Sequence, residues 1–278
     1  MNSRHNGPLA LRALALTVSA LLGTVSSFII LSGAEAILRG HDLALLGAVW
    51  NPAARQFGIL TMIQASLVLS LSSLCVGFCV SLGCCCMLNG LAPHVVAKVL
   101  MGALTLMTAI PTVVYGFAAV FLLVPLIRGA LGGTGFCWLA AGLLLALQGV
   151  PTMTFIMHGA VRSIASETRF TAAALGVTPR QHLSCIVLPL SNRAMLQAAI
   201  LGLGRAVGDA LLPTMLAGNA IRFAHSPLDS VRTLTAHISL VLSSDIGGGE
   251  HFSLLLAGAL LLAFCAVVSL TARRLTRR

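Results

Sequence analysis

The sequence predicts an all-α, polytopic membrane protein built as a bundle of about six transmembrane helices. Of its 278 residues, 58% are hydrophobic and only 9% are charged, and the mean hydropathy is +0.98. A soluble domain needs a more polar surface than this composition provides. Glycine is abundant, at 27 residues, and aromatic residues make up 5%, a balance that suits closely packed membrane helices. The short alternating segments of a membrane β-barrel are missing from the sequence.

Six apolar stretches are each long enough to cross a bilayer. They span about 9–32, 57–88, 98–127, 136–158, 194–217 and 252–272. The second and third are longer than a bilayer requires, which predicts tilting, bending or extension into water. Prolines predict breaks at Pro111 and Pro125 in the third stretch, Pro151 in the fourth and Pro213 in the fifth. We interpret 1–278 as one transmembrane domain, with a five-span core over 57–272 and an uncleaved first span.

The basic residues predict an orientation with both termini in the cytoplasm. With the N-terminus inside, cytoplasmic segments hold Arg4, Arg12, Lys98, Arg162, Arg169, Arg180, Arg193, Arg273, Arg274, Arg277 and Arg278. External segments then hold only Arg39, Arg55, Arg128, Arg222 and Arg232. Positive charge concentrates on the cytoplasmic side of membrane proteins. The formal net charge of +10 is therefore a topology signal, and no single basic patch indicates nucleic-acid binding.

Neither a metal site nor a catalytic site is predicted. The eight cysteines lie almost entirely within predicted spans, and the run Cys84, Cys85 and Cys86 has no accompanying CxxC pairs or histidines, so we interpret them chiefly as small packing residues. The sequence contains no HExxH, GxSxG or Walker A motif. We expect a protein that is not an enzyme and that binds no cofactor itself.

The longest cytoplasmic segment, about 159–193, carries a recognisable pattern. An alanine-rich helix former is followed by Gly176, which suits a helix C-terminus with positive φ, and by Pro179, which suits the first turn of the next helix. We expect that second helix to close at Pro189. The alternative is an ordinary amphipathic loop lying against the membrane.

The stretch AAALGVTPRQHLSCIVLP resembles the coupling loop of ABC-importer permeases, in which an EAA triplet and a glycine precede an I-x-L-P sequence. The matching residues are Gly176, Ile186, Leu188 and Pro189. The EAA positions fall at Phe170, Thr171 and Ala172, so a phenylalanine replaces the family's glutamate. The resemblance implies that this loop docks a short helix into a cytoplasmic ATPase subunit, which hydrolyses ATP with Mg²⁺ in place of this chain.

The stretch LGLGRAVGDALLPTMLAGNA is similar to the phosphate-importer permeases, as are IPTVVYG at 110–116, WNP with FGIL at 50–60, and RTLTAHI at 232–238. The likeness is greater to the PstC type than to the PstA type. It implies a type I ABC importer permease of the bacterial inner membrane. The implied partners are a PstA-like permease, two ATPase subunits and an extracytoplasmic phosphate-binding protein.

The charged residues of the fifth span suggest where an anion passes. Arg205 and Asp209 are four residues apart, so on one helix they share a face and can form an ion pair. At mid-span they must face protein or water, and the planar fork of Arg205 suits an oxyanion such as phosphate. A purely structural ion pair is the alternative. Tyr115 either lines the same pathway or packs beside Gly116, and for His237 we prefer a capped external helix over a gate or binding-protein contact.

The function predicted is therefore translocation of inorganic phosphate into the cytoplasm by an ATP-driven importer. Two alternatives stay open. One is a permease for another oxyanion or small solute, because one arginine does not discriminate among tetrahedral anions. The other is a signalling or scaffold protein that has lost transport, which the phenylalanine at position 170 makes worth testing.

Overall fold

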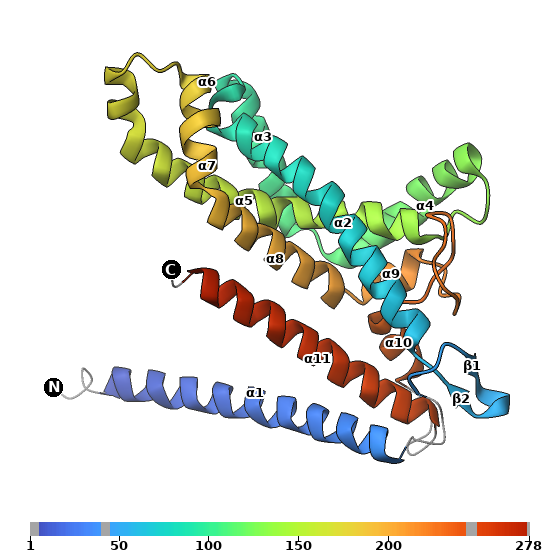
Figure 1. Cartoon of the computed structure of the whole chain (residues 1–278). Helices are drawn as coiled ribbons and strands as arrows, with labels where there is room; N and C mark the ends of the chain where they lie inside the picture. Colours follow the sequence, from blue (N-terminus) through green and yellow to red (C-terminus); the bar gives the residue numbers. More distant parts are fainter. Residues whose placement is uncertain (1–5, 40–44, 243–248, 277–278) are drawn as a thin grey trace.

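The computed structural model of the protein describes residues 6–39, 45–242 and 249–276. Nearly all of its elements are helices, and most of them are long rods (Figure 1). Within the described residues, five helices are long and apolar enough to cross a membrane, or six if the bent pair Pro179–Leu190 and Asn192–Gly208 is one span. The predicted all-α membrane bundle is confirmed.

The first and last helices lie side by side at one edge of the bundle (Figure 1). These are α1 (Asn6–Arg39) and α11 (Gly249–Thr276), which include the predicted spans 9–32 and 252–272. Their contact depends on small residues, because a Cβ atom added at Gly33 would overlap the Cβ of Ala259. On its inner side α11 packs against α8 (Asn192–Gly208), so α11 connects α1 to the rest of the bundle.

A small β-hairpin precedes the second span. Strands β1 (Trp50–Asn51) and β2 (Gln56–Phe57) pair antiparallel, with Trp50 opposite Phe57, around the 3₁₀ turn Pro52–Ala54. The Asn51 side chain accepts the Ala54 N–H at 3.4 Å, which caps that turn. The NPAAR sequence is therefore the tip of a hairpin at the right-hand end of the molecule (Figure 1).

The centre of the bundle is the packing of α2 (Leu60–Cys86) against α5 (Trp138–Ala174), with α8 against both. Small residues bring α2 and α5 together: a Cβ at Gly77 would lie 3.1 Å from the Ala146 carbonyl oxygen. Polar side chains then bridge the two helices, since Trp138 Nε1 donates to Ser72 Oγ at 2.8 Å. Close approach together with interhelical hydrogen bonds is how membrane helices associate.

The third predicted span is two helices, α3 (His94–Ala109) and α4 (Thr112–Leu131), reached from α2 through the turn Met87–Leu91. The predicted break at Pro111 is confirmed, because Ile110 has the extended backbone that a following proline favours. The breaks predicted at Pro125 and Pro151 are wrong, since α4 and α5 continue through them. A membrane helix tolerates the lost hydrogen bond where the chain around it satisfies the freed carbonyl.

The fifth span is interrupted in a different place from the one predicted. Helix α8 ends at Gly208, and α9 (Leu211–Leu216) begins after Asp209 and Ala210. The predicted break at Pro213 is wrong because Pro213 lies in the first turn of α9, where a backbone N–H has no helical partner in any case. After a long loop, α10 (Leu234–Val241) packs against α11, α2 and α9.

Candidate coupling turn and substrate pathway

The turn after α5 is built by local sequence. Helix α5 ends at Ala174, and Gly176 has φ +73°. The Gly176 N–H donates to the Ala173 carbonyl and the Val177 N–H to the Ala172 carbonyl, both at 3.0 Å. This pair of bonds is a Schellman motif, which needs a left-handed residue that glycine supplies without strain. The predicted positive φ at Gly176 is confirmed.

The next helix starts just as abruptly. The Thr178 side chain accepts the Gln181 N–H at 3.4 Å, and the Gln181 side chain accepts the Thr178 N–H at 3.1 Å, which completes a capping box. Pro179 occupies the first helical position, as predicted. From there α6 (Pro179–Gln181), the π-helical turn His182–Val187 and α7 (Leu188–Leu190) follow without interruption.

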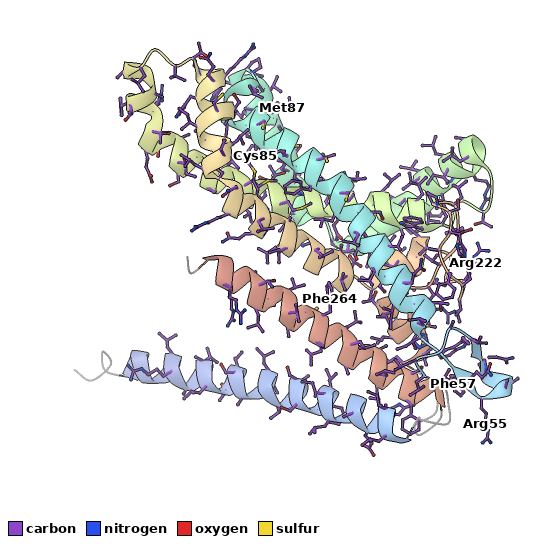
Figure 2. All side chains as sticks on the ribbon, viewed as in Figure 1. Arg55, Phe57, Cys85, Met87, Arg222 and Phe264 are labelled. Carbon is purple, nitrogen blue, oxygen red and sulfur yellow. The ribbon has the colours of Figure 1, made fainter. Side chains whose placement is uncertain are left out.

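The end of α5 and the helical segment Pro179–Leu190, which together we call the helix pair, are anchored to the bundle. Thr168 Oγ1 on α5 lies 2.8 Å from His182 Nε2, which ties the two arms of the turn together. Leu183 and Val187 are buried in a cluster with residues of α2, α5 and α8: Cys85, Met153, Met157, Val161 and Ala198. Figure 2 shows Cys85 at the same end of the molecule. A cleft of about 710 Å³ is lined by the end of α5, by the segment that follows it and by the turn Met87–Leu91.

The predicted coupling residues fall on both arms of this turn. Phe170 is 84% exposed, Thr171 is exposed and Ala172 is buried. On the second arm Ile186 and Leu188 are half-buried and Pro189 is exposed. The upstream Glu167 accepts the Ser163 hydroxyl at 3.4 Å. Phe170 is therefore a large, exposed apolar side chain at the position where the related pattern has glutamate.

The predicted close of this helix at Pro189 is confirmed to within one residue. The helix ends at Leu190, and the chain bends by 65° between Leu190 and Asn192. Ser191 sits at the bend, where its hydroxyl donates to the Val187 carbonyl at 2.7 Å and its backbone N–H to the same carbonyl at 3.0 Å. The π-helical turn just before Pro189 already departs from α-helical bonding, which accommodates the N–H that proline lacks.

The charged pair of the fifth span does not share a helix. Helix α8 ends at Gly208, and Asp209 has the extended dihedrals φ −75° and ψ 123°. Its carboxylate turns toward α9, where Oδ1 accepts the Leu211 N–H at 2.9 Å and the Leu212 N–H at 3.1 Å. Within the described residues Arg205 and Asp209 form no ion pair. The predicted pairing is wrong because the helix ends between the two side chains.

Arg205 itself is exposed near the end of α8, with no side-chain partner in the described part of the chain. The glycines around it have different neighbours. A Cβ at Gly202 would meet Met153 of α5, and one at Gly204 would meet Val268 of α11, whereas Gly208 faces open space. Gly202 and Gly204 thus permit helix packing. Gly208 leaves room beside the break between α8 and α9 at Asp209 and Ala210, which we call the charged break.

Comparison with known proteins adds to this geometry. Residues 90–278 match the family described as "Binding-protein-dependent transport system inner membrane component". The chain belongs to this family. It is also 31% identical to a probable ABC transporter permease, YqgH of Bacillus subtilis, over 82% of this chain and 75% of that protein. The PstC phosphate transport permease of Xylella fastidiosa is 29% identical over 82% of this chain and 76% of its own length.

The fold of the permease agrees with this membership. The methionine ABC transporter MetNI, solved in an inward-facing conformation, superposes with a TM-score of 0.62 at 17% identity, covering 79% of this chain and 94% of that one. The permease is therefore a multi-pass membrane subunit of an ABC importer, a family whose members are not catalytic. Membership implies that an ATPase and a substrate-binding protein work with it.

The carbonyl of Asp209 connects the charged break of the permease to α10. Thr235 Oγ1 donates to this carbonyl at 2.9 Å, and the Leu234 N–H donates to Ser66 Oγ of α2 at 2.8 Å. Thr233 caps α10 by accepting the Ala236 N–H at 3.1 Å. His237 is fully buried and follows one turn later. The capped helix that we preferred for this position is therefore present.

His237 links three elements. Its Nε2 lies 3.1 Å from Ser253 Oγ of α11, and the Trp50 ring of the hairpin packs edge-on at 4.7 Å between centroids. Because Ser253 Oγ donates to the Glu250 carbonyl, it accepts from Nε2, which leaves Nδ1 with a lone pair and no partner. Burial, reinforced by repulsion from Arg232, lowers the pKa of His237 to about 4.

Tyr115 contributes to the α3–α4 joint. Its hydroxyl donates to the Met107 carbonyl at 3.0 Å, across the break at Pro111. Its ring packs against the core of α2, α4, α5 and α9, and Gly116 receives Met215 of α9. Tyr115 therefore has a packing role in this structure, and its place on a substrate pathway stays a prediction.

Arg232 is a candidate site residue that the sequence did not single out. We assigned it only to an external segment, yet its side chain is half-buried, and burial lowers its pKa. Its Nε donates to the Asn219 carbonyl at 3.1 Å, and no carboxylate within the described residues pairs with it. Its place in the sequence RTLTAHI, next to the cap residue Thr233, is the signal that was available.

Among the described residues no three His, Cys, Asp or Glu side chains gather as metal ligands.

Proposed function

We propose that the permease carries inorganic phosphate into the cytoplasm as one transmembrane subunit of an ATP-driven importer. The observation that carries this proposal is the match to PstC phosphate permeases over most of the chain. The sequence LGLGRAVGDA, in which an arginine lies beside glycines near a helix end, supports it chemically. A guanidinium makes two charge-assisted hydrogen bonds to an oxyanion, which a lysine ammonium does not reproduce.

Arg205 is the residue we assign to the passing anion. It is exposed and unpaired within the described residues, so it needs no internal bond broken before it meets a ligand. We assign Asp209 a positioning role, since its carboxylate holds the N-terminus of α9. In this arrangement Asp209 fixes the chain next to Arg205 while the arginine remains free.

The partners proposed are a PstA-like permease, two ATPase subunits and an extracytoplasmic phosphate-binding protein. The α5–α6 turn would contact the ATPase through Phe170, whose ring is almost fully exposed. ATP and Mg²⁺ would be bound by the ATPase subunits. Closure of these subunits would pull on the turn, and the capped, anchored helix pair would transmit that movement as a rigid body.

This assignment places the α5–α6 turn and both termini in the cytoplasm of a bacterium, with the permease in its inner membrane. The positive residues support that orientation. The hairpin lies at the opposite end from the α5–α6 turn (Figure 1), and it would then face the extracytoplasmic side.

Phosphate uptake in cells lacking this chain tests the proposal. The native chain should restore uptake, and Arg205→Ala should lower it tenfold or more, because a charge-assisted hydrogen bond contributes about 1.5–3 kcal/mol. Arg205→Lys should restore uptake only partly. Full uptake by a normally expressed Arg205→Ala chain would contradict the role of Arg205.

The competing substrate class is another oxyanion. Substrate-stimulated ATPase activity of the reconstituted complex, compared for phosphate and sulfate, separates the two. The replacement of the family glutamate by Phe170 favours a second candidate, a scaffold without transport activity. Copurification of the permease with an ATPase that phosphate stimulates would rule against it.

A further inference from the structure

Arg232 carries a half-buried charge that no carboxylate in the described part of the chain neutralises. It lies just before α10, between Val231 and Thr233, which are 1% and 2% exposed. Its Nε donates to the Asn219 carbonyl at 3.1 Å, which is a bond to a neutral group. Desolvation lowers the pKa of the guanidinium. Burying a charge without a counter-ion is costly, so the position indicates a function that needs the charge.

A second arginine of the same loop shows what a structural role requires. Arg222 likewise donates from Nε to a backbone carbonyl, that of Ser230, at 3.1 Å. It is exposed, however, and its Nη2 lies 3.3 Å from Asp229 Oδ1, so its charge has a partner. An arginine can therefore hold this loop while it is solvated and paired. Holding the loop does not explain why Arg232 is half-buried and unpaired.

The guanidinium of Arg232 has donors left for a ligand. Of its five N–H donors, only the one on Nε has an acceptor among the described residues. The terminal nitrogens Nη1 and Nη2 are not buried, so an anion can reach them. They carry four N–H groups in one plane, a geometry that suits two oxygens of a single oxyanion.

Two hydrogen bonds place Arg232 beside α9, the helix that starts at the charged break. Its Nε binds the carbonyl of Asn219, which follows the C-terminal end of α9. Thr235, three residues after Arg232, donates to the Asp209 carbonyl at the other end of that helix, at 2.9 Å. A helix as short as α9 is only about 9 Å long. Arg205 lies one turn before Asp209, so both arginines are near this helix.

We propose that Arg232 is a second contact for the transported oxyanion, which meets it on the extracytoplasmic side of Arg205. This inference rests on the proposed function, whose orientation puts the hairpin outside. Helices α9 and α10 lie beyond the end of α8, toward the hairpin (Figure 1). The passing anion supplies the counter-ion that Arg232 lacks within the described residues. A guanidinium at each of two steps lowers the cost of taking phosphate out of water.

The test combines phosphate uptake, in cells lacking this chain, with ATP hydrolysis by the whole importer in nanodiscs. Arg232→Gln should lower uptake about tenfold or more, as expected for losing a charge-assisted hydrogen bond. ATP hydrolysis stimulated by the phosphate-loaded binding protein should fall much less, since the variant leaves the α5–α6 turn intact. Arg232→Lys keeps the charge but loses the planar fork, so its uptake should be intermediate at an unchanged melting temperature.

The matched control is Arg222→Gln, which removes an exposed ion pair of the same loop and should leave uptake near the native level. Full uptake by Arg232→Gln, where Arg205→Ala is impaired, overturns the role of Arg232 and leaves the proposed function intact. A parallel loss of melting temperature, ATP hydrolysis and uptake in both Arg232 variants would show that this residue only holds the loop. A native chain that restores no phosphate uptake contradicts the proposed function, and this inference with it.

Discussion

The clearest prediction concerns Asp209, where Asn and Ala separate two roles of the same side chain. In the structure, Asp209 Oδ1 accepts two backbone N–H groups at the start of α9. Asn keeps an oxygen in that place and loses the charge, whereas Ala loses both. If Asp209 acts by capping, Asp209→Asn should transport phosphate nearly as the native chain does.

The magnitude follows from the two hydrogen bonds. Asn and Asp are about equal as N-caps, and their replacement by Ala costs about 1 kcal/mol, with a range of about 0.5–2. Here two N–H groups lose one acceptor, but the Leu211 bond is exposed and the Leu212 bond only partly buried, so the full penalty of a buried unsatisfied donor does not apply. We therefore expect Asp209→Ala to destabilise the break by about 1–2 kcal/mol, and Asp209→Asn to change it by a few tenths.

Two measurements check this. Apparent melting temperature in detergent should rank native and Asp209→Asn together and Asp209→Ala below them. Phosphate uptake in cells should follow the same order, with Asp209→Asn within about threefold of native, since a few tenths of a kcal/mol is a factor of two or so. A stable, well-expressed Asp209→Asn chain without uptake would refute capping and show that the negative charge is needed.

Four further outcomes are expected. Phe170→Ala should leave the melting temperature unchanged, because the side chain is 84% exposed, and should lower the amount of ATPase that copurifies. Gly176→Ala should cost about 1–2 kcal/mol for its left-handed backbone and reduce phosphate-stimulated ATP hydrolysis, although no atom blocks the added methyl group. Gly202→Val should lower expression and melting temperature, since its Cβ would lie 2.5 Å from Met153 Sδ. Because the pKa of His237 is lowered to about 4, the unfolded chain takes up a proton first, so the melting temperature should fall from pH 6.5 toward 4 and fall less in His237→Asn.

Much of the α5–α6 turn was predictable because its determinants are local. Gly176 and Pro179 each act on backbone groups within a few residues, so their spacing alone indicates a helix end and a helix start. The Thr178 cap between them is equally local, although it was not predicted. The sequence also showed directly that Arg205 interrupts an apolar span and that Phe170 stands where the related pattern has glutamate. Their roles in transport are not decided by local spacing and stay proposals.

Other features of the site depended on contacts that no spacing reveals. The i, i+4 relation of Arg205 and Asp209 suggested an ion pair only on the assumption that one helix contains both. The helix ends at Gly208 instead, where Thr235, 26 residues away, donates to the Asp209 carbonyl. The Gln64 side chain of α2 likewise bonds the backbone N–H and carbonyl of Ala224, 160 residues away.

The sequence by itself determined the membrane-spanning class, the approximate spans and the turn chemistry, because apolar length and capping act locally and the bilayer imposes the rest. Only the tertiary structure decided which prolines interrupt a helix. Helix α8 ends before Asp209, whereas Pro125 and Pro151 lie within continuous helices. The reason is that a proline removes one backbone hydrogen bond, and whether the remaining bonds and the packing of the helix outweigh that loss is a property of the folded chain.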